Sequence, residues 1–184
     1  TANIGLEHTD IATNERGAIV VNDTCESSVP GVYAVGDVNG GPQFTYVSLD
    51  DFRIVFGALT GSGHYTLKDR KNIPYTTFLT PPLSRVGLTE EDAINQGYTI
   101  KTKEMLVATM PRAHVNDYLK GAFKIVVDAE NDLILGATLY SQGAEELINL
   151  IKMAMDNNIP YTYFKNQIFT HPTMAENLND LCNF

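Results

Sequence analysis

Apolar residues follow two different patterns along the chain, and the change falls at a polar, turn-rich stretch over residues 61–75. Before this stretch, the runs 18–21 and 32–35 are continuously apolar, which is typical of strands buried on both faces, as in a parallel sheet. Apolar residues at helical spacing then predict a helix over 46–60. The stretch 61–75 is interpreted as a linker between two regions.

The second region shows the pattern of an antiparallel sheet with helices. Thr89 is expected to cap a short helix that Gly97 closes, and Asn131-Asp132 is expected to turn a hairpin. The expected strands are 76–80, 85–88, 98–109, 122–127 and 133–140. Further helices are expected over 144–157, over 161–167 and from 174 onward. The sequence therefore predicts an α+β fold, with a partial α/β segment in residues 1–70 and an antiparallel sheet with helices in residues 71–184.

The charge balance of the chain limits its partners. The 184 residues include 22 acidic and 13 basic side chains, a net charge of −9, so nucleic acids and anionic membranes would be repelled. No apolar run approaches the roughly 20 residues of a membrane span. The first residues, Thr1-Ala2-Asn3, show neither a signal peptide nor an initiator Met, so the chain is expected to be cytoplasmic and cut from a longer one.

The cysteines and histidines are too scattered for a disulfide framework or a metal site. Cys25 and Cys182 lie at opposite ends of the chain and form no CxxC motif, which fits a reducing compartment. The four histidines form no HxxxH motif and no cluster with cysteine. We therefore predict no metal ligands.

One candidate binding segment ends the run 32–35. Gly36 would let a ligand approach the backbone closely, and Asp37 would stand at the carboxyl edge of the expected sheet, where ligands bind in such folds. The Asp37 carboxylate could accept hydrogen bonds from sugar-type hydroxyls. The alternative is a strand that simply ends in a turn aspartate.

A second candidate lies near the C-terminus. Thr173-x-x-Glu176 has the spacing of a capping box, which would make Glu176 a device that starts a helix at residue 174. On this interpretation His171 is an ordinary loop histidine, held in an extended conformation by the following Pro172.

Residues 17–37 resemble the second FAD motif of the pyridine nucleotide-disulfide oxidoreductases, a family that includes glutathione reductase, dihydrolipoamide dehydrogenase and mercuric reductase. The resemblance implies that Asp37, beside Gly36, hydrogen-bonds the ribityl chain of FAD. It also implies that Phe44 and Thr45 begin a helix whose N-terminus faces the pyrimidine edge of the flavin, where reduced flavin carries negative charge.

The segment His171-Pro172-Thr173-Met174-Ala175-Glu176 resembles the catalytic base motif of the same family. The resemblance implies that His171 acts on a thiol, that Glu176 holds the imidazole, and that the His171-Pro172 bond is cis. Further resemblance to the interface domain lies at 110–113, 120–127 and 135–138. Mercuric reductases differ at the position of His171 and end in an adjacent pair of cysteines, whereas this chain has the single Cys182, so mercury reduction is not expected. The Asp50-Asp51 pair and residues 177–181 look like those of a bacterial branch of mercuric-reductase-like flavoproteins.

The resemblance assigns residues 1–70 to the end of an FAD-binding domain and residues 71–184 to a dimerisation domain. FAD and NAD(P)H would serve the full-length parent, but the chain has no GxGxxG motif and no redox cysteine pair. We therefore expect a homodimer that supplies its histidine to a partner subunit, is inactive alone and binds FAD weakly or not at all. The alternatives are a stand-alone dimerisation module and a different flavin-binding protein built from the same parts.

Overall fold

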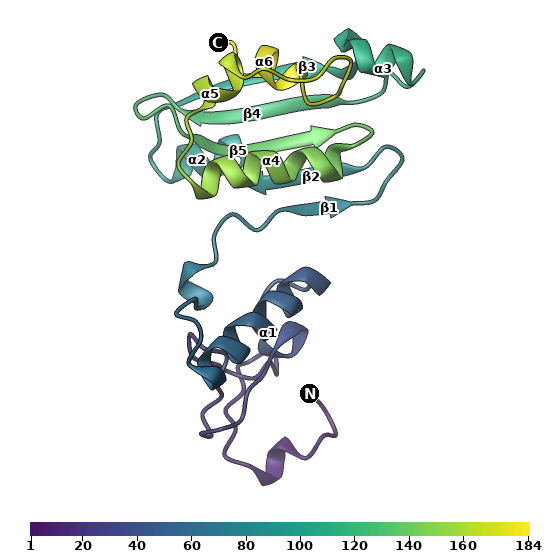
Figure 1. Ribbon diagram of the computed structural model, residues 1–184. Coiled ribbons are helices and arrows are strands. Elements are labelled where there is room, and N and C mark those ends of the chain that lie inside the picture. The colour runs from purple at the N-terminus through teal and green to yellow at the C-terminus, as the bar shows by residue number, and fades with distance from the viewer. The chain divides into compact units, whose positions relative to one another are not determined.

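The computed structural model describes every residue from Thr1 to Phe184 and contains two compact units, Thr1–Lys71 (unit 1) and Asn72–Phe184 (unit 2). Figure 1 shows a long helix in unit 1 and a sheet with helices in unit 2. None of the helices has the length and apolar character needed to cross a membrane.

Unit 1 is built around one helix, α1, which spans Thr45–Thr60 and begins one residue before the predicted start. Three short 3₁₀ turns accompany it: η1 (Leu6–His8), η2 (Gly36–Asn39) and η3 (Leu67–Asp69). Turn η2 packs against α1. Val47 and Ile54 of α1 are buried together with Ile19, Cys25 and Ala34.

The parallel strands predicted at 18–21 and 32–35 are wrong. Both runs form only isolated antiparallel bridges, Thr13 with Ile19, Val21 with Ser27 and Glu26 with Tyr33. Val32 and Val35 remain more than a third exposed, so the second run is not buried on both faces as its composition suggested. The continuous apolar runs indicated buried strands. Within this chain, however, no parallel strand pairs with either run.

Unit 2 is a five-stranded antiparallel sheet in the order β1-β2-β5-β4-β3. Its strands are β1 (Tyr75–Thr77), β2 (Leu83–Gly87), β3 (Ile100–Leu106), β4 (Ala122–Asp128) and β5 (Ile134–Tyr140). Its helices are α2 (Glu90–Asn95), η4 (Val107–Thr109), α3 (Pro111–Val115), α4 (Ala144–Asp156), α5 (Tyr161–Asn166) and α6 (Asn177–Leu181). The predicted α+β fold is confirmed for this region.

The core of unit 2 lies between the sheet and the helices that cover it. Helix α4 lies along β5 and β2, and α6 packs on β3 and β4 (Figure 1). Alternate residues of β4, Phe123, Ile125 and Val127, are almost fully buried, as are Ile148 and Ile151 of α4. Burying such a side chain contributes about 1.5–3 kcal/mol relative to leaving it exposed, so the interlocked apolar faces hold this unit together.

Local sequence signals explain the starts of two helices in unit 2, α2 and α3. The Thr89 hydroxyl accepts from the Asp92 N–H at 2.9 Å, and Asp92 accepts from the Thr89 N–H at 3.1 Å, which confirms the predicted cap. The strand expected over 98–109 ends at Leu106, because 107–109 form η4 and Pro111 opens α3, a helix the pattern did not predict. Proline suits this first helical position because its missing N–H would have no helical partner there.

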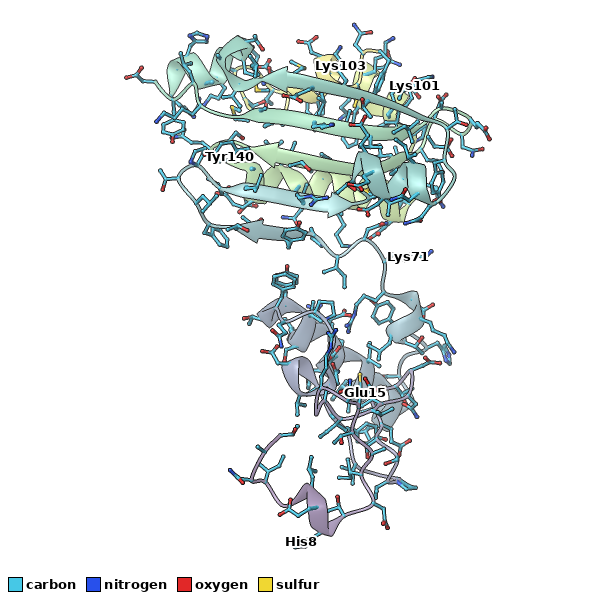
Figure 2. All side chains as sticks on the ribbon, turned by 180° about the vertical axis from the view of Figure 1, so that it is seen from behind. His8, Glu15, Lys71, Lys101, Lys103 and Tyr140 are labelled. Carbon is cyan, nitrogen blue, oxygen red and sulfur yellow. The ribbon has the colours of Figure 1, made fainter.

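Two lysines of β3 tie the C-terminal helices to the sheet (Figure 2). The ammonium group of Lys103 donates to the carbonyl oxygen of Asp180 in α6 at 2.7 Å. The ammonium group of Lys101 lies 5.9 Å from the ring centroid of Tyr161 in α5. Since the segment 167–176 connects α5 to α6, these contacts attach the two helices that flank the His171 segment to the sheet.

Candidate functional site

The sequence-predicted pair His171 and Glu176 is in contact. The His171-Pro172 bond is cis, as predicted, and Nδ1 of His171 lies 2.7 Å from Oε2 of Glu176. The His171 side chain is 68% exposed, whereas the Glu176 side chain is 18% exposed. An accessible imidazole is therefore held by a carboxylate that the chain partly encloses.

The capping-box contacts are present as well. The second carboxylate oxygen of Glu176, Oε1, accepts from the Thr173 N–H at 3.0 Å, and the Thr173 hydroxyl accepts from the Glu176 N–H at 3.2 Å. The two alternatives therefore coexist, because each oxygen of one carboxylate has its own donor. Helix α6 begins only at Asn177, not at 174, since Thr173–Glu176 form this turn ahead of it.

The charge on Glu176 determines which nitrogen of His171 carries the proton. The hydrogen bond from His171 holds the pKa of Glu176 below its usual value, with the Thr173 N–H acting in the same direction. An ionised carboxylate can only accept hydrogen bonds, so Nδ1 of His171 must be the donor. Nε2, for which the chain provides no partner, then bears the lone pair of a neutral imidazole.

Two asparagines of α6 brace this segment. Asn177 Nδ2 donates to the carbonyls of Thr173 and Met174, at 3.2 and 3.1 Å. Asn179 Nδ2 donates to the carbonyls of Phe164 and Gln167, at 2.7 and 2.9 Å. Sequence reasoning gave these side chains no structural role, because their partners are backbone carbonyls that no side-chain pattern marks.

The second predicted segment, Gly36-Asp37, forms the start of η2 in unit 1. Gly36 has φ of +72°, and a Cβ placed there would lie 2.8 Å from the Ser48 hydroxyl, so both the backbone conformation and the packing require glycine. The Asp37 carboxylate is exposed and makes no hydrogen bond within the chain. It lines an open depression of about 550 Å³ that Arg16 and Gln43 also line.

The helix predicted to start after this segment does so. Phe44 is the N-cap residue of α1, with extended backbone, and Thr45 is its first residue. No side chain caps this N-terminus, whose aligned peptide dipoles carry positive partial charge. All four predicted binding residues, Gly36, Asp37, Phe44 and Thr45, thus belong to η2 and the adjoining start of α1, whereas His171 and Glu176 belong to unit 2.

One buried residue of unit 1 was not predicted as part of a site from the sequence. Asp51 is fully buried and accepts from the Gly36 N–H at 2.7 Å and from Asn39 Nδ2 at 2.9 Å. Arg70 donates to the carboxylates of both Asp50 and Asp51. A pair of adjacent aspartates followed by a distant arginine was the signal available, but nothing in the pattern identified the partners.

Neither cysteine is a nucleophile in this fold. Burial raises the pKa of Cys25 to about 11, with the charge of Asp51 adding to the effect, and burial raises the pKa of Cys182 to about 12. Both thiols are fully buried and stay protonated near neutral pH. No group of three or more His, Cys, Asp and Glu side chains is arranged to hold a metal ion. A thiol substrate for His171 would therefore have to come from outside these residues.

The comparisons with known proteins agree with this geometry. Residues 73–182 match the family described as "Pyridine nucleotide-disulphide oxidoreductase, dimerisation domain", and residues 1–51 match "Pyridine nucleotide-disulphide oxidoreductase". Since the first match covers more than half of the chain, the chain belongs to the pyridine nucleotide-disulfide oxidoreductases, and unit 2 contains their dimerisation domain. The family prediction made from the motifs is confirmed.

Two relatives show how similar the chain is to known members of the family. The chain is 49% identical over 181 residues to the probable pyridine nucleotide-disulfide oxidoreductase RclA of Escherichia coli, covering 98% of this chain and 41% of the relative. It is 32% identical to a mercuric reductase of Staphylococcus aureus, covering 97% of this chain and 32% of the relative. The chain thus spans less than half the length of these relatives.

The fold of the chain is also found in solved structures. The structure titled "HOCl-induced flavoprotein disulfide reductase RclA from Escherichia coli" superposes with a TM-score of 0.95 at 48% identity, over 99% of this chain and 42% of that one. LpdA of Mycobacterium tuberculosis, at 22% identity and a TM-score of 0.88, shows the same fold.

Proposed function

We propose that this chain acts as the C-terminal part of an FAD- and NAD(P)H-dependent disulfide reductase. In this proposal residues 71–184 form a homodimer, and His171 and Glu176 of one subunit serve the active site of the other. The chain alone is inactive. The observation that carries the proposal is the exposed imidazole whose Nδ1 is held at 2.7 Å by a partly enclosed carboxylate.

The pair is suited to moving a proton at a thiol. Nε2 of neutral His171 takes the proton of a cysteine S–H, which leaves the thiolate that attacks or leaves a disulfide. The positive charge that forms on the ring is stabilised by ionised Glu176 through Nδ1. In the reverse direction, Nε2 returns the proton to a departing thiolate. Because both cysteines of this chain are buried and protonated, the reactive thiols belong to other parts of the full-length protein.

The residues of unit 1 fit one edge of an FAD site. The exposed Asp37 carboxylate could accept from ribityl hydroxyls, the bare backbone at Gly36 allows close approach, and Phe44 and Thr45 would present the N-terminus of α1 to the pyrimidine edge. When bound, FAD supplies the transfer of two electrons from the nicotinamide to the disulfide. With only this edge of the site, the chain alone should lose yellow colour on desalting.

The role of His171 can be tested by separating the two half-reactions in the full-length protein. We expect His171→Ala to slow the thiol–disulfide steps by about 10²–10⁴-fold, the range of general-base contributions, while NAD(P)H still reduces the flavin at the normal rate. His64→Ala, at an exposed histidine of unit 1, is the matched control and should leave both rates unchanged. Equal loss of both half-reactions in His171→Ala would contradict the proposal.

The delivery of His171 to a partner subunit has its own test. A His171→Ala subunit and a subunit without the redox cysteines should each be inactive as homodimers. Co-expression should restore disulfide reduction, because one site of the mixed dimer then has both its histidine and its cysteines. No recovery in an isolated mixed dimer would favour a histidine that acts within its own subunit.

Dimerisation is tested by sedimentation. An obligate interface of this type buries more than about 2,000 Å², so the chain should sediment as a dimer at micromolar concentration. A dimer that forms without any role for His171 in the full-length enzyme would support the stand-alone dimerisation module instead. The complete core of unit 2 is compatible with such a module.

A further inference from the structure

A fully buried carboxylate lies behind the proposed flavin edge. Asp51, on the inner face of α1, is 0% exposed. Its Oδ2 accepts from the Gly36 N–H at 2.7 Å and from Asn39 Nδ2 at 2.9 Å, and its Oδ1 accepts from Arg70. A buried carboxylate is costly unless donors satisfy it, so this constellation is a specific arrangement of donors around one charge.

Arg70, the cation of this network, also binds a second carboxylate, Asp50. Arg70 Nε donates to Asp50 Oδ2 at 2.7 Å, and the Tyr65 hydroxyl donates to the same Asp50 oxygen at 3.3 Å. The Arg70 side chain is only 11% exposed, which keeps its charge next to both aspartates. Asp50, unlike Asp51, forms no hydrogen bond with turn η2. The two neighbouring carboxylates therefore share one cation but differ in what else they hold.

The two η2 residues that Asp51 binds, Gly36 and Asn39, lie on either side of Asp37 in the sequence. Gly36 precedes Asp37, and Asn39 follows it by two residues. Asn39 is itself tied to the backbone, because its Oδ1 accepts from the Gly41 N–H at 3.0 Å and its Nδ2 donates to the Ala34 carbonyl at 3.3 Å. Both sides of the turn are fixed from within, while the Asp37 carboxylate faces outward without a partner in the chain.

We propose that Asp51 is a positioning residue for flavin binding, which orients Asp37 by holding Gly36 and Asn39 from the buried side of η2. This inference rests on the proposed function, in which Asp37 contacts FAD. A preorganised turn binds with less loss of conformational freedom than a mobile one, so the contribution of Asp51 should be seen in FAD affinity. A purely structural role would instead lower the stability of unit 1 and weaken FAD binding independently of Asp37.

A double-mutant cycle in the full-length apoprotein separates these roles. The dissociation constant of FAD is measured by fluorescence titration for the parent, Asp37→Ala, Asp51→Asn and the double variant. Asp51→Asn should weaken binding at least about tenfold, which corresponds to about 1.4 kcal/mol, in the parent background. In the Asp37→Ala background the same change should have little effect, because the side chain that Asp51 orients is gone. Equal losses in both backgrounds would overturn the inference.

The cycle also distinguishes failure of the inference from failure of the proposed function. If Asp37→Ala leaves FAD affinity unchanged, the proposed flavin edge is wrong. If Asp37→Ala weakens binding but Asp51→Asn does not, or is not coupled to it, the flavin edge stands and the role of Asp51 is wrong.

Asp50→Asn is the matched control, since it removes the negative charge of one partner of Arg70 at a residue that forms no hydrogen bond with η2. It should leave FAD affinity within about threefold of the parent, well short of a tenfold, 1.4 kcal/mol change. An effect as large as that of Asp51→Asn would assign the role to the ion pair and overturn the inference. The thermal midpoint of each apoprotein shows whether it is folded. If Asp51→Asn does not fold, Asn39→Ala takes its place in the cycle, where a loss coupled to Asp37→Ala supports the inference and an uncoupled one overturns it.

Discussion

The two units of the chain bury apolar surface to different extents. In unit 2, strands and helices enclose a continuous core that includes Phe123, Ile125, Leu139, Ile151 and Leu178, all at most 1% exposed. In unit 1 the burial of apolar side chains is limited to Ile19, Cys25, Ala34, Val47 and Ile54. The outer stripe of α1, formed by Leu49, Phe52, Phe56 and Leu59, is 49–65% exposed. A contiguous exposed apolar stripe of this kind is typical of an interaction surface.

The two candidate site residues, His171 and Asp37, are therefore held in different ways. The His171 segment is braced by a unit with a complete core, through Lys101, Lys103, Asn177 and Asn179. The Asp37 turn depends instead on a small polar network around Asp51. We therefore expect the stability of the chain to reside in unit 2, and unit 1 to be the part that opens first.

The largest expected effect tests this division directly. Phe123→Ala should lower the free energy of unfolding of unit 2 by about 3–5 kcal/mol, because it leaves a cavity in a close-packed core. Phe52→Ala, at a 54% exposed position of α1, is the matched control and should change stability by less than about 0.5 kcal/mol. Urea unfolding followed by circular dichroism measures both. Similar losses at the two positions would contradict the proposed concentration of stability in unit 2.

Sequence patterns predicted the elements of unit 2 better than those of unit 1, for the same reason. Alternation over 122–127 and 133–140 and the capping signal at Thr89 are local, and packing in unit 2 reinforces them. The runs 18–21 and 32–35 were wrongly assigned to a parallel sheet, because apolar character indicates burial without saying what provides it. The strand order β1-β2-β5-β4-β3 and helix α3 were not predicted, since both depend on contacts or turns outside any single pattern.

In the candidate site, too, the sequence did not reveal contacts that only the fold creates. The residues His171 and Glu176 were predicted to pair from the motif that they share with the family, and their contact is confirmed. Asp51 was not recognised, because its partners Gly36, Asn39 and Arg70 lie 12–19 residues away and donate through a backbone N–H, an amide and a guanidinium. No periodicity relates such positions. Only the fold brings them together.

The two cysteines give a second, smaller measure of the difference between the units. Both thiols are fully buried and have raised pKa values, about 11 for Cys25 and about 12 for Cys182, so alkylation requires local opening. With its smaller core, unit 1 should open more often, so Cys25 should react with iodoacetamide at pH 8 faster than Cys182. Each 1.4 kcal/mol of difference in opening free energy gives about a tenfold difference in rate.

Mass spectrometry of timed samples would give both rates in one experiment, and Cys25→Ser and Cys182→Ser would confirm the assignment of each modified peptide. Both sites should react more slowly than a cysteine in the urea-unfolded chain. Faster modification of Cys182 than of Cys25 would show that unit 2 is the less stable unit.

The smallest expected effect concerns the His171–Glu176 pair itself. Since hydrogen bonding lowers the pKa of Glu176 in the folded chain, the pair contributes stability above the pKa of an unfolded glutamate, about 4.3, and loses it as the pH falls through the lower, folded-state pKa. His171 is 68% exposed, so solvent screens the pair and its contribution at pH 7 should stay below about 1 kcal/mol. Glu176→Gln should therefore unfold at slightly lower urea concentration than the parent at pH 7.

That difference should shrink as the pH falls through the lowered folded-state pKa of Glu176, because the parent carboxyl then becomes neutral as well. Glu104→Gln serves as the control, because Glu104 is an exposed carboxylate of unit 2 without an ion-pair partner, and it should show no pH-dependent difference from the parent. A loss of several kcal/mol in Glu176→Gln would mean that the carboxylate maintains the fold of unit 2. A small, pH-dependent loss would instead leave the His171–Glu176 pair as a feature that unit 2 supports but does not need for its stability, as expected of residues placed to act on a partner.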